Sequence, residues 1–358
     1  MWDAIVAGAG PAGAVAALML ARRGRRVLLA DRIDPSAHKI GEALPGAAVR
    51  LLRSLDLPAP AAGGPHTPIG GNLAAWNSAA LVATDFIRDP YGPGWRLDRA
   101  RFDADLRAAA AGAGVTSRGA HVRDLGRQDA GWRIGFDDGS VEHARWIVDA
   151  TGRRSALARK LGVRRQRGAR LVALYALGRA ALDFQLNRTM LEAAPDGWWY
   201  AARLPSGAAV AGFHTHAREA ARLNADPDAW KHALGRTRHI GFALGCAQFE
   251  QPLRAMEACG ARLAQFGGDG WIACGDAALS FDPISGQGIF SALHSGMAAG
   301  SAVADALEHN GASLDGYANR METVWGIYAA RSRAIYGSER RWATEPFWVR
   351  ARSLTLRS

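Results

Sequence analysis

The chain has 358 residues, 49% of them hydrophobic and 22% charged, which is enough for a large core in two domains or in one domain with a sizeable insertion. Its formal net charge is +11, but the basic residues are dispersed and form no nucleic-acid-binding motif. The composition therefore favours a globular protein that does not bind nucleic acid. The positive charge would suit a cofactor with two phosphates, or an acidic substrate or peptide partner.

The cysteines and the N-terminal segment indicate the compartment. Cys246, Cys259 and Cys274 lack the spacing of a metal site and fit a reducing compartment without a disulfide framework. The apolar start includes Asp3 and runs directly into a glycine-rich turn, so it does not resemble a signal peptide. No apolar run is long enough for a transmembrane helix. We expect a cytoplasmic protein without a metal site or a membrane span.

A short strand followed by a glycine-rich turn is predicted at the start of the chain. Residues 4–7 form an apolar run typical of a buried parallel strand, and the sequence GAGPAG occupies positions 8–13. In this pattern Gly8 allows a tight turn, Gly10 lets the backbone approach a pyrophosphate, and Gly13 lets the next helix pack closely against the strand. The pattern therefore predicts a binding site for the phosphates of a dinucleotide.

The helix and strand that follow the turn strengthen this prediction. Pro11 suits the first turn of a helix, where its missing N–H costs nothing and the helix N-terminus attracts phosphate. A strand at 27–30 then ends in Asp31, about 20 residues after the glycines, where a carboxylate suits a ribose hydroxyl. A glycine-rich turn without a ligand would leave Asp31 unexplained. The residues predicted to bind the cofactor here are Gly8, Gly10, Pro11, Ala12, Gly13, Asp31 and Arg32.

The middle of the chain changes from helical to extended character. The first expected elements are a loop at 38–47, a helix at about 47–55, a Pro/Gly/Ala-rich linker at 57–71, strands at 73–87, a helix at about 99–112, a hairpin at 131–145 and a strand at 146–150. Residues 170–256 contain more strand-like stretches and one helix, expected near 217–235. These stretches, at 171–177, 198–204 and 208–214, predict an antiparallel sheet that forms a substrate domain.

A second glycine-rich region follows an apolar strand expected at 271–274. The strand leads to Gly275 and Asp276, and a carboxylate beside a glycine at a strand end suits a ribityl or ribose hydroxyl. Helix capping is the alternative role for Asp276. A long apolar helix is expected at about 287–307, and its N-terminus would face the pyrimidine of a flavin. Together the two glycine-rich regions predict bound FAD, and the loop residues predicted to contribute are Pro283, Gly286 and Gly288.

Three motifs stand in the order found in FAD-dependent aromatic monooxygenases. The sequences GxGxxG at 8–13, DATG at 149–152 and GD at 275–276, with the loop after the last, resemble those enzymes, which have the p-hydroxybenzoate hydroxylase type of fold. The resemblance covers nearly the whole chain. The FAD contacts that it implies are the adenosine ribose for Asp31, the ribityl or pyrophosphate region for Asp276, and a further contact from Arg99.

Other segments resemble a narrower subgroup. The sequence GEALP at 41–45 is similar to the flavin-contacting strap of tryptophan halogenases. Residues 197–200, 204–205, 339–342 and 347–348 are similar to a halogenase-related subgroup that includes flavoproteins that hydroxylate peptidyl tryptophan during maturation of tryptophylquinone enzymes. The resemblance implies an aromatic substrate, an indole or tryptophan unit, either free or within a peptide or protein.

The lysines bear on the choice between hydroxylation and halogenation. Halogenases of this family need a lysine that captures hypochlorous acid, between the strap and a tryptophan, but residues 66–76 contain none. The only lysines in the chain are Lys39, Lys160 and Lys231. The halogenase sequence Trp-x-Trp-x-Ile-Pro is also altered at 198–205. Because an oxidant must be positioned to react selectively, we expect hydroxylation and not halogenation.

The expected reaction needs a reductant and oxygen. The resemblance implies NAD(P)H as reductant and O₂ as co-substrate, with hydroxyl transfer to an electron-rich ring through a flavin C4a-hydroperoxide. No separate NAD(P)H-binding fingerprint is present, so direct reduction and reduction by a partner protein both stay open. A halogenase and an FAD-dependent reductase of the prenyl reductase type are the alternative enzymes. An FAD-binding module without activity is the third alternative.

Glu42, Trp199 and His214 are the candidate catalytic residues. Glu42 lies in the strap, where it would contact substrate or order the strap. The aromatic run 198–200 is a candidate lining of the substrate site, with core packing as the alternative. His214 and His216 lie on one face of an expected strand, and one of them is a candidate base or substrate-orienting residue. A surface histidine, or a core histidine with its hydrogen bonds satisfied, is the alternative.

The elements together predict an α/β fold. We expect a Rossmann-like FAD-binding domain with an inserted antiparallel-sheet substrate domain and a C-terminal helical region. The predicted boundaries are 1–72, 95–165 and 261–310 for the FAD-binding domain, 73–94 and 166–260 for the substrate domain, and 311–358 for the helical region.

Overall fold

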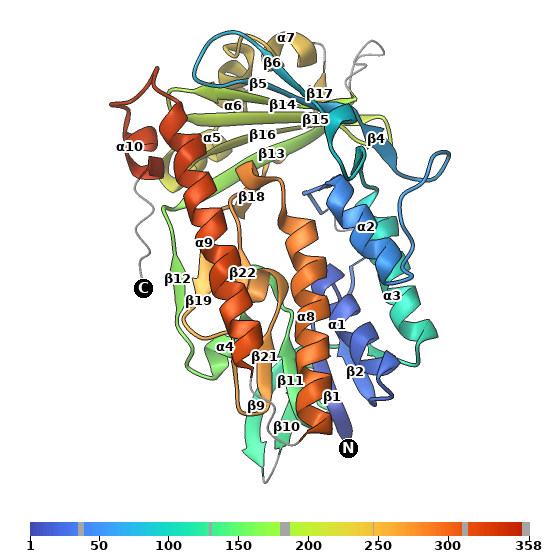
Figure 1. Cartoon of the computed structure of the whole chain (residues 1–358). Helices are drawn as coiled ribbons and strands as arrows, with labels where there is room; N and C mark the ends of the chain where they lie inside the picture. Colours follow the sequence, from blue (N-terminus) through green and yellow to red (C-terminus); the bar gives the residue numbers. More distant parts are fainter. Residues whose placement is uncertain (35–38, 129–130, 180–186, 246, 310–313, 353–358) are drawn as a thin grey trace.

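The computed structural model describes the chain apart from residues 35–38, 129–130, 180–186, 246, 310–313 and 353–358. One sheet forms the lower half of Figure 1 and a second sheet the upper half. Two long helices, α8 (Gly288–Glu308) and α9 (Asp315–Ser338), run beside the lower sheet, and α9 reaches the level of the upper one.

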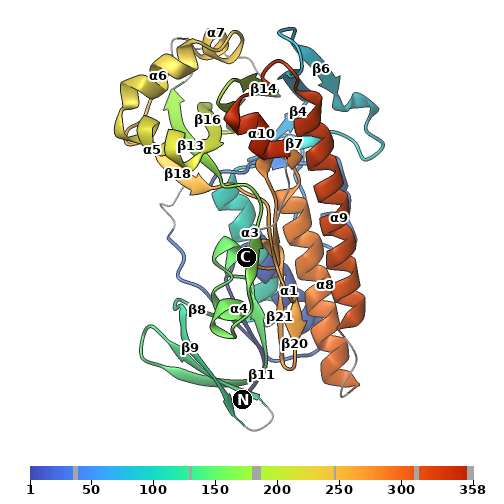
Figure 2. The same cartoon turned by 90° about the vertical axis from the view of Figure 1, so that its left-hand side faces the viewer.

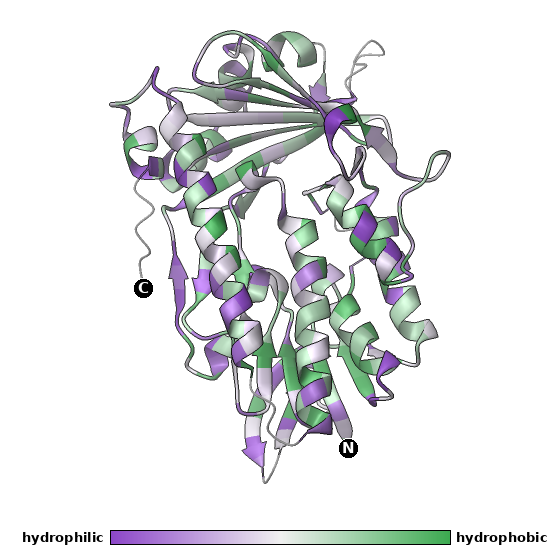
Figure 3. Cartoon of the chain, viewed as in Figure 1, coloured by the Kyte–Doolittle hydropathy of each residue, from purple (hydrophilic) through white to green (hydrophobic). Residues whose placement is uncertain are grey.

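The lower sheet has the strand order β20-β21-β11-β1-β2-β8, in which all pairs are parallel except β20 with β21. β10 also pairs with β11, and β9 pairs with β10, both antiparallel. In its centre β1 pairs in parallel with β2 and β11, and β11 pairs in parallel with β21. Residues 4–7 of β1 are buried, as expected for a parallel sheet covered on both faces, and Figure 3 shows these central strands as hydrophobic. The strands are β1 (Trp2–Ala7), β2 (Val27–Ala30), β8 (Thr116–Arg118), β9 (Val122–Gln128), β10 (Gly131–Phe136), β11 (Val141–Asp149), β20 (Gly267–Gly268) and β21 (Trp271–Ala273).

The helix α8 packs closely on α1 (Pro11–Arg22), the helix that follows the first glycine-rich turn. Glycines in α8 allow this approach. A Cβ added to Gly296 would lie 2.3 Å from the carbonyl oxygen of Ala12, and one added to Gly300 would lie 2.6 Å from that of Ala16. The start of α8 is thereby held near the start of α1, which brings the two glycine-rich regions into one place.

The upper sheet has the order β17-β13-β16-β15-β14-β5-β6, with β18 also paired to β13. Its pairs are antiparallel except for β14 with β5, which are parallel. The two segments predicted as a substrate domain, 73–94 and 166–260, both contribute strands to it. The strands are β5 (Gly71–Ala75), β6 (Val82–Asp85), β13 (Leu171–Arg179), β14 (Arg188–Ala194), β15 (Gly197–Arg203), β16 (Ala208–His216), β17 (Gln248–Phe249) and β18 (Arg254–Glu257).

The two faces of the upper sheet pack against different helices. Figure 2 shows α5 (Ala217–Ala225), α6 (Pro227–Gly235) and α7 (Ile240–Leu244) on one side of it and α9 with α10 (Pro346–Arg352) on another. The core under α5–α7 contains Trp199, Phe213 and Trp230. A separate aromatic cluster joins Trp198 of the sheet to the C-terminal helices. The remaining helices are α2 (Gly46–Ser54), α3 (Arg99–Gly112) and α4 (Ala156–Lys160), with 3₁₀ turns η1 (Phe86–Arg88), η2 (Gly152–Arg154), η3 (Gly275–Ala277) and η4 (Pro283–Ser285).

Two small sheets connect the halves of the molecule. One has the order β3-β7-β4 and ties the segment at 41–45 to residues 67–69 through β7. The other has the order β12-β19-β22 and lies next to the second glycine-rich region. Their strands are β3 (Ala43–Leu44), β4 (Thr67–Ile69), β7 (Gly94–Arg96), β12 (Arg165–Arg167), β19 (Ala261–Leu263) and β22 (Leu279–Ser280).

The predicted fold class is confirmed, whereas some predicted elements are wrong. The single helix expected at 217–235 is two helices, because Asp226 caps α6 with its side chain and Pro227 starts it. The hairpin strand and the apolar strand expected around 141–150 are one strand, β11, which pairs antiparallel at its start and parallel at its end. The expected linker at 57–71 contains the strand β4.

Within the described ranges, no helix is long and apolar enough to cross a bilayer. In the same ranges, no three His, Cys, Asp or Glu side chains are grouped so as to hold a metal ion.

Candidate cofactor and substrate site

The first glycine-rich turn contains two glycines that the protein's own packing requires. Gly8 has a φ of +103°, and a Cβ there would lie 2.2 Å from the carbonyl oxygen of Ala150. A Cβ on Gly13 would lie 1.9 Å from the carbonyl oxygen of Gly8. These two glycines therefore allow β1, α1 and the end of β11 to meet without any ligand.

Gly10 is different, because packing does not require a glycine there. A Cβ on Gly10 would meet nothing within 4 Å. Gly10 is also the N-cap of α1 in an extended conformation, and no side chain caps this helix. The first N–H groups of a helix have no partner within the helix, so the N-terminus at Pro11 and Ala12 can bind an anion. The open space over Gly10 and the uncapped helix fit the pyrophosphate of a dinucleotide.

Asp31 lies beside this turn at the end of β2. One carboxylate oxygen accepts a 2.8 Å hydrogen bond from the backbone N–H of Ala9, and the other lies 3.6 Å from Nδ1 of His121. The Asp31 side chain is 27% exposed, so its carboxylate can accept a further hydrogen bond from a ligand on the exposed side. Arg32 is more exposed and pairs with Asp137 at 3.2 Å. Asp31 therefore lies where a ribose hydroxyl is expected, whereas Arg32 is paired with Asp137 of the same chain.

The second glycine-rich turn touches the first. Gly275 has a φ of +59°, and a Cβ there would lie 2.6 Å from the Cβ of Ala12. The backbone N–H of Gly275 donates to Oγ of Ser295 in α8 at 2.9 Å. Asp276 lies inside the turn η3, whose N-cap is Cys274, so Asp276 does not cap it. The Asp276 side chain is 38% exposed and lies 3.5 Å from Nε of Arg153, which leaves it able to face a cofactor.

Arg165 holds the backbone of this turn in place, and no sequence pattern predicted it. Its guanidinium donates to the carbonyl oxygens of Asp276 and Ala277, both at 3.1 Å, and to the hydroxyls of Ser155 and Ser280 at 2.6 and 2.7 Å. Burial lowers the pKa of Arg165 to about 10, so it stays charged at neutral pH. A buried cation thus fixes the backbone of the turn that presents Asp276.

The DATG motif stabilises the neighbouring chain segment. The carboxylate of Asp149 accepts hydrogen bonds from the backbone N–H groups of Thr151, Leu157 and Ala158 at 2.8 to 3.0 Å. Asp149 is 1% exposed. Its role in the ligand-free molecule is therefore to hold the start of α4 against β11, behind the first glycine-rich turn.

The loop before α8 is open toward the same region. Gly286 has a φ of +62°, and added Cβ atoms on Gly286 and Gly288 would meet nothing within 4 Å. The helix α8 starts at Gly288 without a side-chain cap. Pro283 begins the turn η4, which Asp282 caps through a 3.0 Å hydrogen bond from the N–H of Ile284. The free N-terminus of α8 fits a group that gains negative charge, as a flavin ring does on reduction.

Asp282 is a buried carboxylate that the sequence did not single out. Its side chain accepts a 2.6 Å hydrogen bond from the hydroxyl of Tyr336 in α9, and that hydroxyl accepts one from Nε1 of Trp198 at 3.0 Å. Burial raises the pKa of Asp282 to about 6 from the ordinary 3.8, although these hydrogen bonds oppose the rise. The loop before α8 is therefore tied to both the upper sheet and the C-terminal helix.

The strap at 41–45 is held by Arg99 and by a backbone hydrogen bond from Leu97. Arg99 donates to the carbonyl oxygens of Ile40 and Gly41, both at 3.0 Å, and also contacts Asp103. Glu42 is 2% exposed, and its backbone oxygen accepts a 2.8 Å hydrogen bond from the N–H of Leu97. The contacts that the structure shows for Arg99 are thus to the strap and α3, and its contact with FAD stays a prediction.

Glu42 belongs to a buried polar cluster between the strap and the upper sheet. The hydroxyl of Tyr200 hydrogen-bonds with the Glu42 carboxylate and accepts from Nη1 of Arg96 at 2.9 Å. Nη2 of Arg96 donates to the hydroxyl of Thr189 at 2.8 Å. Burial is the largest cause of the raised pKa of Tyr200, which keeps its proton. The hydroxyl of Tyr200 therefore bonds to both the Glu42 carboxylate and the Arg96 guanidinium where the strap crosses the sheet.

The aromatic run in β15 divides between the two faces of the upper sheet. Successive residues of a strand point to opposite faces. Trp199 is therefore packed with Phe213 and Trp230 under α5–α7, at centroid distances of 4.6 and 5.4 Å. Trp198 and Tyr200 occupy the other face. Trp198 is linked to Asp282 through the hydroxyl of Tyr336, and Tyr200 contacts Glu42 of the strap directly. Trp199 is thus not placed with the predicted cofactor residues, and core packing accounts for it.

His214 lies on the same face as Trp198. The two rings are parallel with centroids 3.6 Å apart, and the histidine is 4% exposed. Nδ1 of His214 has no hydrogen-bond partner in the described part of the chain. Burial lowers the pKa of His214 to about 3, so the ring is neutral near pH 7. A general base works best with a pKa near the working pH, so this position favours an orienting role over proton transfer.

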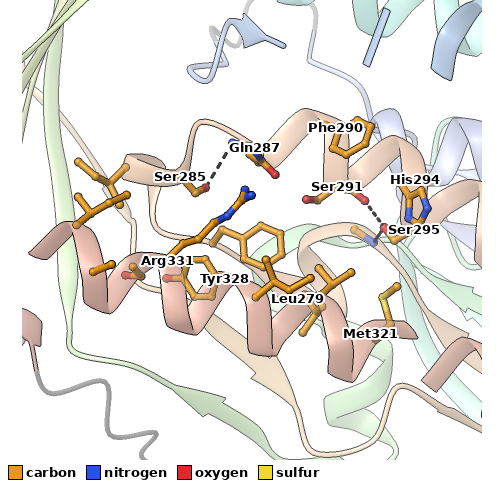
Figure 4. A pocket seen from close by; sticks show the side chains of 18 residues that line it. Leu279, Ser285, Gln287, Phe290, Ser291, His294, Ser295, Met321, Tyr328 and Arg331 are labelled. Atoms are coloured by element: carbon orange, nitrogen blue, oxygen red, sulfur yellow. Dashed lines mark hydrogen bonds between the residues drawn. The ribbon is translucent and has the colours of Figure 1, made fainter. Parts of the chain in front are cut away.

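A pocket of about 640 Å³ opens between α8 and α9 (Figure 4). It extends from Gly275 and Ser295 at the second glycine-rich turn to the loop before α8. Its lining is mainly apolar, with a few polar side chains that include Gln287, His294 and Arg331. Pockets of this size and character are typical small-molecule sites. None of the candidate catalytic residues Glu42, Trp199 and His214 lines it.

Known proteins resemble this chain over nearly its whole length. LodB of Marinomonas mediterranea, whose name describes an FAD-dependent oxidoreductase, is 33% identical over 98% of this chain and 96% of its own. The solved structure of the peptidyl tryptophan dihydroxylase QhpG, essential for tryptophylquinone cofactor biogenesis, has a TM-score of 0.78 and 28% identity, covering 98% of this chain and 78% of that one. The flavin-dependent halogenase CmlS shares the fold with a TM-score of 0.85 and 22% identity, covering 98% of this chain and 67% of that one.

A family model settles the broader relationship. The model described as "FAD binding domain" matches residues 1–328, which include both glycine-rich regions and the whole upper sheet. The expected relationship to FAD-dependent monooxygenases and halogenases is confirmed at the level of family and fold. The chain belongs to the FAD-binding domain family.

Proposed function

We propose that this chain is an FAD-dependent monooxygenase that hydroxylates an electron-rich aromatic ring, an indole or tryptophan unit that is free or part of a peptide. The observation that carries the proposal is the segment beside the strap. Residues 67–69 pair with β7, which also pairs with the strap strand β3, and no lysine lies between 66 and 76. The halogenases that the strap resembles need a lysine in this segment to capture hypochlorous acid. The likeness to QhpG also supports hydroxylation.

The proposed cofactor site follows from the residues already described. The space over Gly10 and the N-terminus of α1 hold the pyrophosphate, Asp31 holds the adenosine ribose, and Asp276 holds a ribityl hydroxyl. When bound, FAD supplies the redox and oxygen chemistry of the reaction. Pro283, Gly286 and Gly288 shape the loop that places the N-terminus of α8 against the flavin.

The protein's own residues position the reactants and exclude water. Glu42, Tyr200 and Arg96 lock the strap onto the upper sheet, and both charged groups are 2% exposed. We assign Glu42 a role in ordering the strap. His214, which is neutral near pH 7, is assigned a positioning role through its stacking on Trp198. Trp199 supports the sheet from its other face.

The reductant and the compartment complete the proposal. NAD(P)H is the proposed reductant, acting directly or through a partner reductase, and O₂ is the co-substrate. The formal net charge of +11 would favour an acidic peptide substrate. The proposed compartment is the cytoplasm.

Two rival reactions are separated by their products. The halogenase alternative is supported by the fold of CmlS and would need an amine near the reacting ring. Lys39 precedes the strap, but its Nζ pairs at 2.9 Å with Asp103, which also accepts a hydrogen bond from Arg99. The prenyl-reductase alternative would add hydrogen to an alkene and consume no oxygen.

The test supplies FAD-loaded protein with a chemical reductant, O₂ and candidate indoles, in the presence and absence of bromide or chloride. We expect a substrate-dependent product heavier by one oxygen, about 16 Da, at the same yield with and without halide. A product with a chlorine or bromine isotope pattern would show halogenation. Reduction of an aliphatic alkene without oxygen uptake would show a reductase.

A further inference from the structure

The pocket between α8 and α9 combines aromatic walls with a polar rim. Phe281 and Phe290 line it from the α8 side, and Tyr328 lines it from α9. The hydroxyl of Tyr328 accepts a 3.2 Å hydrogen bond from the backbone N–H of Asp282, which fixes the ring. Ser285 and Gln287 lie at the rim, next to the start of α8 (Figure 4). The walls therefore suit a flat apolar group.

The charged lining of the pocket is of one sign only, positive. Its lining includes no Asp or Glu, and Arg331 is its one permanently charged side chain among the described residues. Burial lowers the pKa of His294, with a smaller contribution from the cation of Arg320. The carboxylates nearest in the sequence are engaged elsewhere, since Glu322 pairs with Arg262 and Asp282 accepts from Tyr336. The pocket is therefore positive and has no internal counter-charge.

Arg331 carries this positive charge and can bind a ligand. Its side chain is exposed and has no hydrogen bond or ion pair with the described residues. Figure 4 shows it reaching from α9 across the pocket toward Gln287 and Ser285. An arginine in this position can bind a carboxylate with two parallel hydrogen bonds. The apolar walls below it would at the same time remove an attached ring from water.

We propose that this pocket binds an aromatic ring that carries a nearby carboxylate, with the ring against the wall formed by Phe281, Phe290 and Tyr328 and the carboxylate on Arg331. The inference rests on the proposed function and deepens it by naming the substrate class. One wall of the pocket is the loop that is proposed to hold the flavin. The carboxylate belongs either to a free aromatic acid or to an Asp or Glu beside an aromatic residue of a peptide.

Other ligand classes fit the pocket less well. A long alkyl chain would leave Arg331, Gln287 and Ser285 without partners at the rim. A free phosphate would gain one arginine but would face apolar walls below it, which desolvate it without compensation. An aromatic carboxylate satisfies both parts of the lining.

Binding is measured by isothermal titration calorimetry on FAD-loaded protein without reductant, so that no turnover occurs. The first pair of probes is indole-3-acetate and its neutral analogue indole-3-acetamide. The second pair is acetyl-Trp-Asp-amide and acetyl-Trp-Asn-amide. The variants are Arg331→Gln, the control Arg333→Gln, and Ser291→Phe, which places a ring inside the pocket. Arg333 is exposed on the same helix but does not line the pocket, and it contacts only the carbonyl oxygen of Ala329 among the described residues.

We expect at least one acidic probe to bind about tenfold or more tightly than its neutral partner, as a charge-assisted hydrogen bond allows. Arg331→Gln should remove this preference, Arg333→Gln should keep it, and Ser291→Phe should weaken the acid and the amide alike. Preference in the first pair of probes alone identifies a free acid, and preference in the second pair alone identifies a peptide. Equal binding of acid and amide, a preference that survives in Arg331→Gln, or no saturable binding would overturn the inference.

The two proposals fail separately. If indoles are oxygenated but no probe binds with a dependence on Arg331, the monooxygenase stands and this pocket is not its acid-binding site. If the acids bind as expected but no oxygenated product forms, the pocket assignment stands and the proposed reaction is wrong.

Discussion

The hydroxyl of Tyr336 donates a 2.6 Å hydrogen bond to the carboxylate of Asp282, and the same hydroxyl accepts one from Nε1 of Trp198 at 3.0 Å. One hydroxyl thus joins the helix α9, the loop before α8 and the upper sheet. All three side chains are buried. The orientation of the loop before α8 therefore depends on a contact made far along the chain.

Replacing Tyr336 with phenylalanine should destabilise the fold. The change leaves the Trp198 N–H and the Asp282 carboxylate each without one hydrogen bond in a buried place, which costs about 1–3 kcal/mol. Urea unfolding monitored by circular dichroism measures the free energy of unfolding. Tyr91→Phe is the matched control, because Tyr91 is 51% exposed. Equal stability of the two variants would show that the Tyr336 hydroxyl contributes nothing.

Asp282 should make stability depend on pH in a particular direction. Its folded pKa of about 6 lies above the ordinary 3.8, so the folded state binds this proton more tightly than the unfolded state. Its contribution is then full below about pH 4 and is lost as the pH rises through about 6. The free energy of unfolding of the wild type minus that of Asp282→Asn should therefore fall between about pH 4 and pH 7.

Urea titrations at several pH values measure this difference. Asp228→Asn removes an acid whose side chain is 77% exposed and gives the background for losing a surface carboxylate. A difference between wild type and Asp282→Asn that rises with pH would mean that Asp282 is ionised and stabilising in the fold.

Gly10→Val should reduce FAD binding while leaving the protein folded. Its Cβ would meet no protein atom within 4 Å, so the valine occupies space proposed for the pyrophosphate and not space filled by the protein. Gly126→Val is the control, because its Cβ also meets nothing within 4 Å but it lies in the strand β9. The ratio of flavin to protein absorbance after purification, and after reconstitution with FAD, measures occupancy. Full occupancy in Gly10→Val would remove this glycine from the cofactor site.

Asp276→Ala should weaken FAD binding through the loss of charged hydrogen bonds. Each such bond contributes about 1.5–3 kcal/mol, so the dissociation constant should rise about tenfold to a hundredfold for one bond. Fluorescence titration of the apoprotein with FAD measures it. Asp305→Ala is the control, an acid that is 51% exposed and pairs with Arg23 at the far end of α8. If both variants bind FAD like the wild type, the Asp276 side chain serves only Arg153.

Local patterns in the sequence predicted the elements around the two glycine-rich turns well. The strand, the glycine-rich turn and the helix at 1–22 form from neighbouring residues, and so does the second turn at Gly275. These two turns meet, with Gly275 against Ala12, because glycines in α8 let that helix pack closely on α1. A signal for the break between α5 and α6 was also present, since Asp226-Pro227 is a typical helix start.

The substrate side could not be predicted in the same way. Strand alternation requires Trp198 and Trp199 to face opposite ways, but the sequence does not tell which face turns toward the cofactor. The partnership of Asp282 with Tyr336 joins residues 54 positions apart through tertiary packing alone. The role of Arg165 could not be predicted either, because its partners are backbone carbonyls and hydroxyls, mainly of distant segments.

The most direct test of the proposed function is mass spectrometry of the product formed under ¹⁸O₂. FAD-loaded protein, a chemical reductant and an indole substrate react with and without bromide. We expect one ¹⁸O atom to enter each hydroxylated product, and bromide to change neither its mass nor its yield. A brominated product, or an oxygen derived from water and not from ¹⁸O₂, would contradict the proposed function.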